Sequence, residues 1–337
     1  MQGFGASARR ASTRAGPRRS AQRRFLLRSS EPIVPETLDP ADERARALRP
    51  ADWRAPGPPP RGVQGRPELV AGPGEDLSYL VGDWRIFQRK GGHRWSLDDF
   101  LTAFVAFDEA ERHGAVSRMV DLGCGIGSVL FMLAWALPTA RAVGIEAQEL
   151  SIGLARRSLA YNGAEDRCDL RHGDLRDPAM LPEGACFDLV TGTPPYIPLG
   201  RGLVSSKVQR GPCCFEMRGG LEEYCEAASA ALAPQGRFVV CAGAWPPDRA
   251  ERAAEKAGLR IARRMQVIPR EGKSLLLEVF TMVARRATAA LSDAEPEPEL
   301  VRFVVRDLGG NLTADMHEAR RRMGLPPAMR RAPKSST

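Results

Sequence analysis

The sequence has no run of 18 apolar residues, which argues against a membrane-spanning helix. Cysteine is sparse: there are seven, an odd number, and no two have the C-x-x-C spacing. That pattern disfavours a disulfide scaffold and fits a reducing compartment. Cys213-Cys214 with His172 or His113 is the best candidate for a metal site, but adjacent cysteines rarely give a four-ligand geometry. We therefore expect no metal and interpret these thiols as buried or loop residues.

Acidic residues are absent from the first 30 positions, which contain eight arginines. The other residues carry 41 basic and 41 acidic side chains, so the net charge of +8 belongs to the N-terminus. The charge is therefore no evidence that the folded part binds nucleic acid. An Arg- and Ser-rich, acid-free start with Phe25-Leu26-Leu27 is typical of an organellar transit peptide, for a mitochondrion ahead of a chloroplast. The alternative is an Arg-rich tail on a cytoplasmic protein.

Proline and charge divide the rest of the chain. Residues 31–75 are rich in proline, with four prolines between Pro56 and Pro60, which predicts a disordered linker. Residues 286–298 are acidic and contain Pro296 and Pro298. The expected segments are a transit peptide (1–30), a linker (31–75), one folded domain (76–285), a second linker (286–298), and a C-terminal strand–helix extension with a basic tail (299–337).

Strands and helices alternate through the domain. After a strand pair at 77–81 and 84–88, Ser96 can cap a helix over 97–112. Further strands are expected at 117–122, 141–146, 167–172, 186–191, 236–242, 259–268 and 274–284, and helices at 127–137, 149–161, 220–232 and 247–257. This alternation predicts an α/β fold: a doubly wound, mostly parallel, seven-stranded sheet with an antiparallel edge hairpin and a ligand at the carboxyl ends of its strands.

The run Asp121-Leu-Gly-Cys-Gly-Ile-Gly127 lies between a short apolar strand and an apolar helix. Gly123, Gly125 and Gly127 allow a tight turn and a close ligand approach, but they do not form the G-x-G-x-x-G dinucleotide fingerprint. Asp121 would repel a pyrophosphate, whereas it suits a ligand with an ammonium and a sulfonium group. The run resembles the Gly-rich loop that carries S-adenosylmethionine in Rossmann-like methyltransferases. A turn without a ligand is the alternative.

Two acids follow the next strands. Glu146 ends its strand 21 residues after Gly125 and can accept hydrogen bonds from both ribose hydroxyls of an adenosyl group. Asp174, in His172-Gly173-Asp174, can accept the amino group of the adenine. The alternatives are a solvated helix cap for Glu146 and a turn around Asp177-Pro178 for Asp174.

The fourth strand of the alternation leads into Thr193-Pro194-Pro195-Tyr196. These residues resemble the D/N-P-P-Y motif of methyltransferases that modify planar amino groups, in nucleobases or in glutamine side chains. The polar group at 193 and the Pro194 carbonyl would accept the two N–H groups, so that the nitrogen lone pair faces the methyl group. The prolines stiffen the loop, and Tyr196 offers a face for stacking. Thr193 departs from the usual Asn or Asp, and a proline turn without catalysis is the alternative.

The segments before and after these motifs narrow the resemblance to one family of methyltransferases. Gly92-His-Arg-Trp-Ser-Leu-Asp98, with Leu101 and Ala103, resembles the lead-in of bacterial tRNA(Val) adenine-37 N(6)-methyltransferases, as do the last strands and the tail from Glu299. The resemblance covers roughly 80–325 and implies that Asp98 contacts the cofactor. Glutamine methyltransferases of release factors have an extra N-terminal helical domain, for which 31–75 is too rich in proline.

The sequence therefore predicts an enzyme that transfers a methyl group from S-adenosylmethionine to a planar amine, foremost adenine N(6) of a tRNA or another structured RNA. The alternatives are a glutamine or small-molecule methyltransferase, and a non-catalytic binding or assembly protein. Basic residues in the loop 197–219 and at Arg320-Arg321-Arg322 and Arg330-Arg331 could contact RNA phosphates, or could simply be solvated.

Overall fold

The structure is a computed structural model that describes residues 49–181, 184, 186–197, 209, 213, 215–285 and 296–328. The expected transit peptide (1–30) lies outside the described residues, as do most of the loop 197–219 and the arginines at 330 and 331. All the described residues belong to one unit, Leu38–Thr337.

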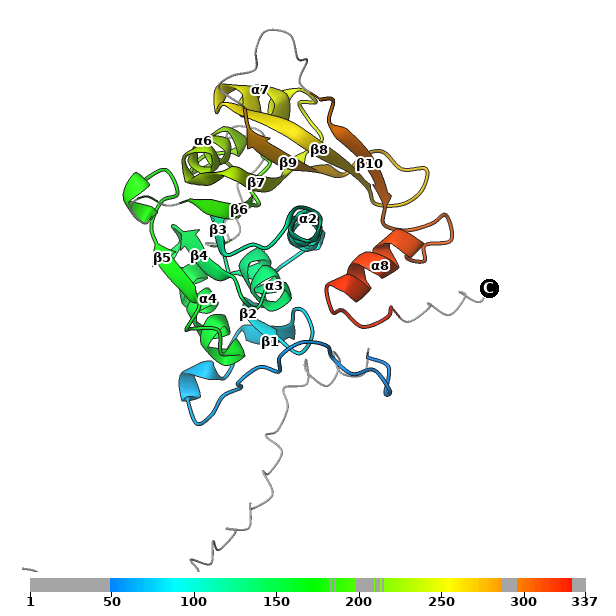
Figure 1. Cartoon of the computed structure of the whole chain (residues 1–337). Coiled ribbons are helices and arrows are strands. Elements are labelled where there is room, and N and C mark those ends of the chain that lie inside the picture. Colours follow the sequence, from blue (N-terminus) through cyan, green and yellow to red (C-terminus); the bar gives the residue numbers. More distant parts are fainter. Residues whose placement is uncertain are drawn as a thin grey trace, which may run out of the picture. The chain divides into compact units, whose positions relative to one another are not determined.

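An eight-stranded sheet organises this unit, in the order β10-β8-β9-β7-β6-β3-β4-β5 (Figure 1). From β7 to β5 every neighbouring pair is parallel, whereas β9 runs antiparallel to both β7 and β8. The predicted doubly wound, mostly parallel sheet is confirmed. Its strands are β3 (Arg118–Leu122), β4 (Arg141–Glu146), β5 (Cys168–His172), β6 (Phe187–Gly192), β7 (Leu232–Gly243), β8 (Leu259–Ile268), β9 (Leu277–Ala284) and β10 (Glu299–Val304).

The sheet has one strand more than expected, β10, and the β8–β9 hairpin therefore does not form the edge of the sheet. The sequence places one strand in the C-terminal extension, and the structure pairs this strand, β10, in parallel with β8. The β8–β9 hairpin is therefore inside the sheet instead of at its edge. A pattern of apolar residues predicts that a strand exists but not its partner, because pairing depends on contacts between distant segments.

Helices cover both faces of the sheet. α2 (Leu97–His113), α3 (Ser128–Ala136) and α4 (Glu149–Asn162) pack on one face, and α6 (Leu221–Ala231) and α7 (Arg249–Lys256) on the other. Successive residues of central strands enter opposite cores: Val239 faces the first layer and Val240 the second. This explains the nearly continuous apolar strands, because a sheet covered on both sides has no solvent face.

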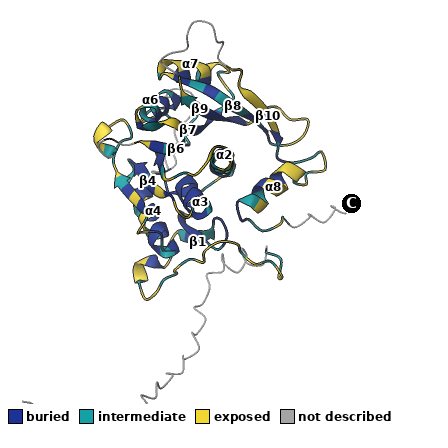
Figure 2. Cartoon of the chain, viewed as in Figure 1, coloured by how far each residue is buried: buried dark blue, intermediate teal, exposed yellow. Residues whose placement is uncertain are grey.

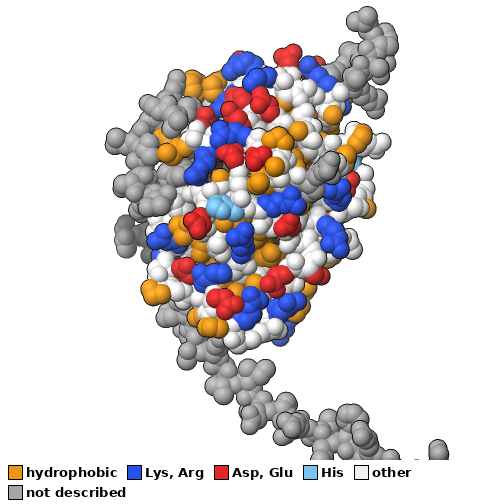
Figure 3. Space-filling view, turned by 90° about the vertical axis from the view of Figure 1, so that its left-hand side faces the viewer, with side chains coloured by type: hydrophobic (Ala, Val, Ile, Leu, Met, Phe, Trp, Pro, Cys, Tyr) orange, Lys and Arg blue, Asp and Glu red, His pale blue; other side chains and the backbone are white. Residues whose placement is uncertain are grey.

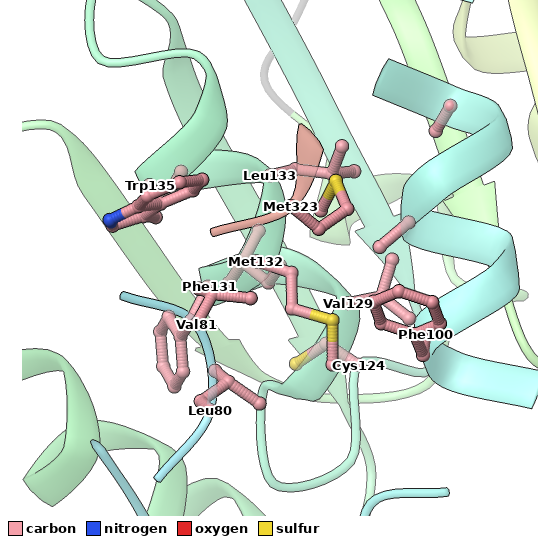
Figure 4. Close-up of a cluster of buried hydrophobic side chains, with 14 of the residues drawn as sticks. Leu80, Val81, Phe100, Cys124, Val129, Phe131, Met132, Leu133, Trp135 and Met323 are labelled. Atoms are coloured by element: carbon pink, nitrogen blue, oxygen red, sulfur yellow. The ribbon is translucent and has the colours of Figure 1, made fainter. Parts of the chain in front are cut away.

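α3 is buried almost all round: eight of its nine residues are buried, from Ser128 to Trp135 (Figure 2). The sheet and α2 cover part of it. The antiparallel pair β1 (Glu75–Tyr79) and β2 (Arg85–Arg89) and the end of α8 (Ala314–Arg322) supply further contacts. Figure 4 shows Met323, directly after α8, beside Met132 and Leu133 of α3. The C-terminal extension is thus part of the main core.

Part of the segment expected to be a disordered linker, 31–75, is packed against the domain instead. From residue 49 on it is described, and it holds a short 3-10 helix, Pro67–Leu69, whose Leu69 is buried. The Arg157 guanidinium of α4 donates to the carbonyls of Glu68 and Val70 at 2.7 and 2.8 Å. Because these bonds satisfy the backbone of the segment, its many prolines do not prevent an ordered path.

The described surface mixes charges of both signs. Figure 3 shows one face, on which Lys and Arg side chains alternate with Asp and Glu side chains. Twenty-five ion pairs are found among the described residues, most of them Arg with Asp or Glu. In the part of the chain that is described, no helix is both long enough and apolar enough to span a bilayer.

Candidate active site

The glycine loop connects β3 to α3 and forms the floor of a hollow. Gly125 has φ +58°, and a Cβ built there would meet no atom within 4 Å, so this position faces open space. Its N–H donates to Glu146 Oε2 at 2.9 Å, which fixes the turn. A glycine-rich loop that leaves open space above Gly125, with a carboxylate behind it, suits an adenosyl ligand. The residues present therefore fit S-adenosylmethionine.

Tyr224 of α6 closes the loop from the other side. A Cβ at Gly123 would lie 2.0 Å from the Tyr224 hydroxyl oxygen, so only glycine fits at this position. Burial raises the pKa of Tyr224 well above its usual value, so the hydroxyl stays neutral. No motif pointed to Tyr224 as part of the site, because α6 is distant from the glycine loop in the sequence.

The hollow brings together residues from the ends of four strands, from two loops and from α2 and α6. Six of the predicted site residues line it: Gly123, Gly125, Glu146, Asp174, Thr193 and Pro195. Its other lining residues include Asp99, Ser128, Arg218 and Tyr224. The carboxyl ends of β3, β4, β5 and β6 thus meet at one site, as the parallel order requires.

Glu146 ends β4 and is 6% exposed. Its Oε1 accepts the Gln148 N–H at 2.6 Å and its Oε2 the Gly125 N–H. Burial raises the pKa of Glu146, and the two N–H donors and the charge of Arg218 oppose this. Each oxygen keeps a second lone pair, so the carboxylate can still accept a ligand hydroxyl.

Asp174 follows β5 at the rim of the hollow. Both of its oxygens accept hydrogen bonds from the Arg176 guanidinium, at 2.9 and 2.6 Å, and this holds the pKa of Asp174 below its usual value. Its Oδ1 also accepts the Arg176 N–H at 3.0 Å, which closes a local turn. The residue thus closes a local turn and also lines the hollow.

Asp121 and Gly127 do not line the hollow. Asp121 lies behind the loop, buried, and its Oδ1 accepts the Thr191 hydroxyl of β6 at 2.8 Å. Burial raises its pKa to about 7. Gly127 starts α3 with φ +89° and packs against the Phe131 ring. Both residues shape the loop instead of facing the ligand space.

The lead-in segment supplies a different acid from the one expected. Asp98 does not line the hollow; its Oδ2 accepts the Tyr196 hydroxyl at 3.2 Å. The next residue, Asp99, lines the hollow instead and is 4% exposed. Its Oδ2 accepts the Ser96 N–H at 2.8 Å in a capping box. The S-x-x-D pattern at 96–99 could have identified Asp99 as the residue fixed at the start of α2.

Burial raises the pKa of Asp99 to about 7, and the charges of Asp98 and Asp121 add to this effect. Asp99 has no ion pair among the described residues, and a buried carboxylate of this kind is a good partner for an ammonium or sulfonium group.

The Thr193–Tyr196 loop forms a wall of the hollow. Thr193 and Pro195 face the same space as the glycines, whereas Pro194 and Tyr196 line a second, smaller hollow toward β7 and β9. Among the described residues, no hydrogen bond occupies the Thr193 hydroxyl. The Tyr196 hydroxyl also lies 2.8 Å from Cys241 Sγ, and burial raises the pKa of Tyr196 well above its usual value.

Trp245, 59% exposed, lines the second hollow together with Pro246 and Arg249. No sequence pattern pointed to Trp245, because a lone tryptophan after a strand is not a motif. The basic residues of the loop 197–219 that could contact RNA are Arg201, Lys207, Arg210 and Arg218. Arg218 lines the hollow of the glycine loop, and the other three lie outside the described residues.

Where the chain is described, no three His, Cys, Asp or Glu side chains are close enough together to hold a metal ion. Cys213 Sγ instead accepts a hydrogen bond from Gln148 Nε2 at 3.5 Å, and Cys214 lies outside the described residues.

Comparison with known families supports the class of fold and site. A family model described as a methyltransferase domain matches residues 114–267, which span β3 to β8 and include both the glycine loop and the Thr193–Tyr196 loop. Residues 114–267 thus match a methyltransferase domain, and they lie in a doubly wound, mostly parallel sheet.

The individual relatives include methyltransferases of two kinds, one named for a tRNA and one for a glutamine of a protein. The tRNA1(Val) (adenine(37)-N6)-methyltransferase of Porphyromonas gingivalis is 30% identical over 179 residues, which cover 52% of this chain and 65% of that protein. The release factor glutamine methyltransferase of Caulobacter vibrioides is 35% identical over 102 residues, covering 30% of this chain and 32% of that protein. The chain thus spans 65% of the length of the first relative and 32% of the length of the second.

Among solved structures, a protein described as a predicted O-methyltransferase, Atu636 of Agrobacterium tumefaciens, is 20% identical with a TM-score of 0.48. The match covers 68% of this chain and 98% of that protein.

Proposed function

We propose that this protein transfers a methyl group from S-adenosylmethionine to the planar amino nitrogen of an RNA base, foremost adenine N(6) of a tRNA. One observation carries the proposal: Thr193 and Pro195 face the same hollow as Gly125 and Glu146. A loop suited to hold an amine and a loop suited to hold an adenosyl group therefore share one space, as in-line transfer between two bound groups requires.

The acceptor amine would be held by the loop after β6. An exocyclic amine is a poor nucleophile because its lone pair is delocalised into the ring. The Thr193 hydroxyl and the Pro194 carbonyl can each accept one of its N–H groups, which turns the lone pair toward the hollow. The Thr193 hydroxyl has no competing partner among the described residues.

The charged end of the cofactor would lie near the start of α2 and α3. S-adenosylmethionine, when bound, supplies the activated methyl group. Asp99 and Ser128 line this side of the hollow and offer oxygens to an ammonium group, while Glu146 lies on the side of the ribose. The sulfonium loses its charge on transfer, so an ionised Asp99 favours binding more than it favours the transfer itself.

The lengths of the matched regions favour RNA over a glutamine side chain as the substrate. The likeness to the tRNA methyltransferase spans 179 residues, against 102 for the glutamine methyltransferase. The second hollow, with Tyr196 and the exposed Trp245 in its lining, offers flat aromatic surfaces of the kind that stack on bases. A glutamine side chain has no aromatic ring that would stack on these surfaces.

The test is methyl transfer by the purified protein from labelled S-adenosylmethionine to unmodified tRNA, followed by mass spectrometry of the nucleosides. We expect N(6)-methyladenosine, and Gly125→Arg should abolish it by filling the hollow. Transfer only to a glutamine-containing peptide, or to metabolites, would overturn the RNA assignment. Cofactor binding without turnover on any of the three pools would indicate a non-catalytic protein.

A further inference from the structure

Three consecutive arginines close α8, and their surroundings differ. Arg321 is exposed, and its guanidinium donates to both oxygens of Glu318 at 2.8 and 2.6 Å. Arg322 pairs with Asp108 at 2.8 Å and also with Glu111. Arg320 pairs with no acid among the described residues; its Nη2 donates to the Pro326 carbonyl at 2.8 Å, and its buried Nε has no partner there. Only one of the three charges is left unneutralised.

Arg320 lines an open hollow that is separate from the two hollows of the candidate active site. The hollow lies between the ends of β8 and β10, the turn at 310–312, and α8, with Leu97 of α2 at one side. Arg306 also lines it and donates to the Gly310 carbonyl at 2.9 Å. His317 and Asn311 add further polar groups.

No Asp or Glu lines this hollow among the described residues. The acid nearest in sequence to Arg306 is Asp307, and its carboxylate accepts the Asn311 N–H at 2.9 Å instead. Burial and the charge of Arg306 together lower the pKa of Arg320, as two like charges facing one space should. A concave site with two such arginines attracts an anion that can accept several N–H donors.

The position of the hollow connects it to the active site. β9 runs antiparallel to both β7 and β8, so β8 and β10 end at the same edge of the sheet as β6, which leads into Thr193. From β6 to β10 there are four strand spacings of about 4.8 Å, or about 19 Å. Leu97 in its wall adjoins Asp98, which binds Tyr196.

We propose that Arg306 and Arg320 bind a backbone phosphate of the RNA whose base enters the active site. The inference rests on the proposed function and extends it to a second contact at the same edge of the sheet. Arginine matches phosphate with paired N–H donors, and contacts to phosphates fix the register of a nucleic acid without reading its sequence. A nucleotide a few positions from the target base would occupy the hollow.

The test is equilibrium binding of unmodified, fluorescently labelled tRNA by anisotropy over a series of salt concentrations. Arg320→Gln and Arg306→Gln should each weaken binding about fivefold or more and lower the salt dependence by about one released counterion. Arg320→Lys should recover part of the loss. Arg321→Gln, from the same helix, is the matched control and should bind within about twofold of the wild type. Cofactor affinity and Tm check that each variant is folded.

Unchanged tRNA binding by both glutamine variants would overturn the phosphate site, even if methyl transfer to RNA is intact. The proposal would also be overturned if the wild type binds inorganic phosphate and both variants lose this phosphate binding while tRNA binding is unchanged. The site would then bind a free anion and not the RNA. A wild type that binds no tRNA and methylates another acceptor would overturn both this inference and the proposed function. Methyl transfer to RNA with the expected losses in binding supports both.

Discussion

The Tyr196 hydroxyl donates to Asp98 Oδ2 at 3.2 Å, and this contact ties the Thr193–Tyr196 loop after β6 to the first turn of α2. The two residues are 98 positions apart in the sequence. The two acids of the lead-in segment therefore have different surroundings: Asp98 contacts the Thr193–Tyr196 loop, and Asp99 lines the hollow of the glycine loop. These different surroundings give the first two predictions.

Asp98→Ala should lower the rate of methyl transfer about tenfold while cofactor affinity changes less than about threefold. The reason is that Asp98 orients Tyr196 and does not line the cofactor hollow. Tyr196→Phe should give a similar but smaller loss, since it keeps the ring and loses the hydroxyl. Rate and affinity are measured separately, by single-turnover transfer and by calorimetry. A large loss of cofactor affinity in Asp98→Ala would show instead that Asp98 contacts the cofactor.

Cofactor affinity should rise with pH between about 6 and 8. Asp99 has a pKa of about 7, raised by burial, and a cationic ligand favours its ionised form, so binding releases a proton. Calorimetry in buffers of different ionisation enthalpy measures that proton. Asp99→Asn should remove the pH dependence and weaken binding. S-adenosylhomocysteine, which lacks the sulfonium charge, should show a weaker dependence, and an identical dependence would argue against a sulfonium near Asp99.

Asp121 should make the protein less stable as pH rises. Its folded pKa of about 7 is above the unfolded value of about 3.9, so the folded state binds more protons between these values and loses stability over that range. The upper limit of this loss is about 4 kcal/mol at about 1.4 kcal/mol per pH unit. Asp121→Asn keeps an acceptor for Thr191 and should flatten the dependence in urea unfolding at pH 5 and pH 8. Parallel curves for the two proteins would contradict this account.

Thr193→Asn should preserve or raise transfer to an amino group. The carboxamide is longer than the hydroxyl and can accept an N–H across the hollow, and Thr193 has room because it is only half-buried. Steady-state kinetics on the accepted substrate provide the measurement. A loss of more than about tenfold in kcat/KM, or about 1.4 kcal/mol of transition-state stabilisation, would indicate a different acceptor geometry.

Residues 1–30 should direct a fused fluorescent reporter into an organelle, with the mitochondrion the first expectation. An acid-free segment with eight arginines has the charge that import signals share. Imaging with organelle markers provides the measurement, and the matched control replaces four of the arginines with glutamine. A reporter that stays in the cytoplasm with the unchanged segment would favour the Arg-rich tail.

The structure confirms most of the secondary structure expected from the sequence. The strand over 259–268 has the same bounds in both, and the helix expected over 149–161 differs by one residue. Local patterns determine such elements, because glycine loops, capping residues and alternating apolar positions act within a few residues. The β10 strand and the packed segment from residue 49 depend on distant partners, and no local pattern specifies those partners.

By itself the sequence predicted that Gly123, Gly125 and Glu146 lie together at the end of the first strands and that Thr193–Tyr196 follows the fourth, because both depend on short-range chain geometry. Tertiary structure alone decided that Asp99 and not Asp98 lines the hollow, that Tyr224 closes the glycine loop, and that one arginine of Arg320–Arg322 faces an open, acid-free space. Charges look alike in a sequence, whereas their effect depends on which partners the fold places within hydrogen-bonding distance.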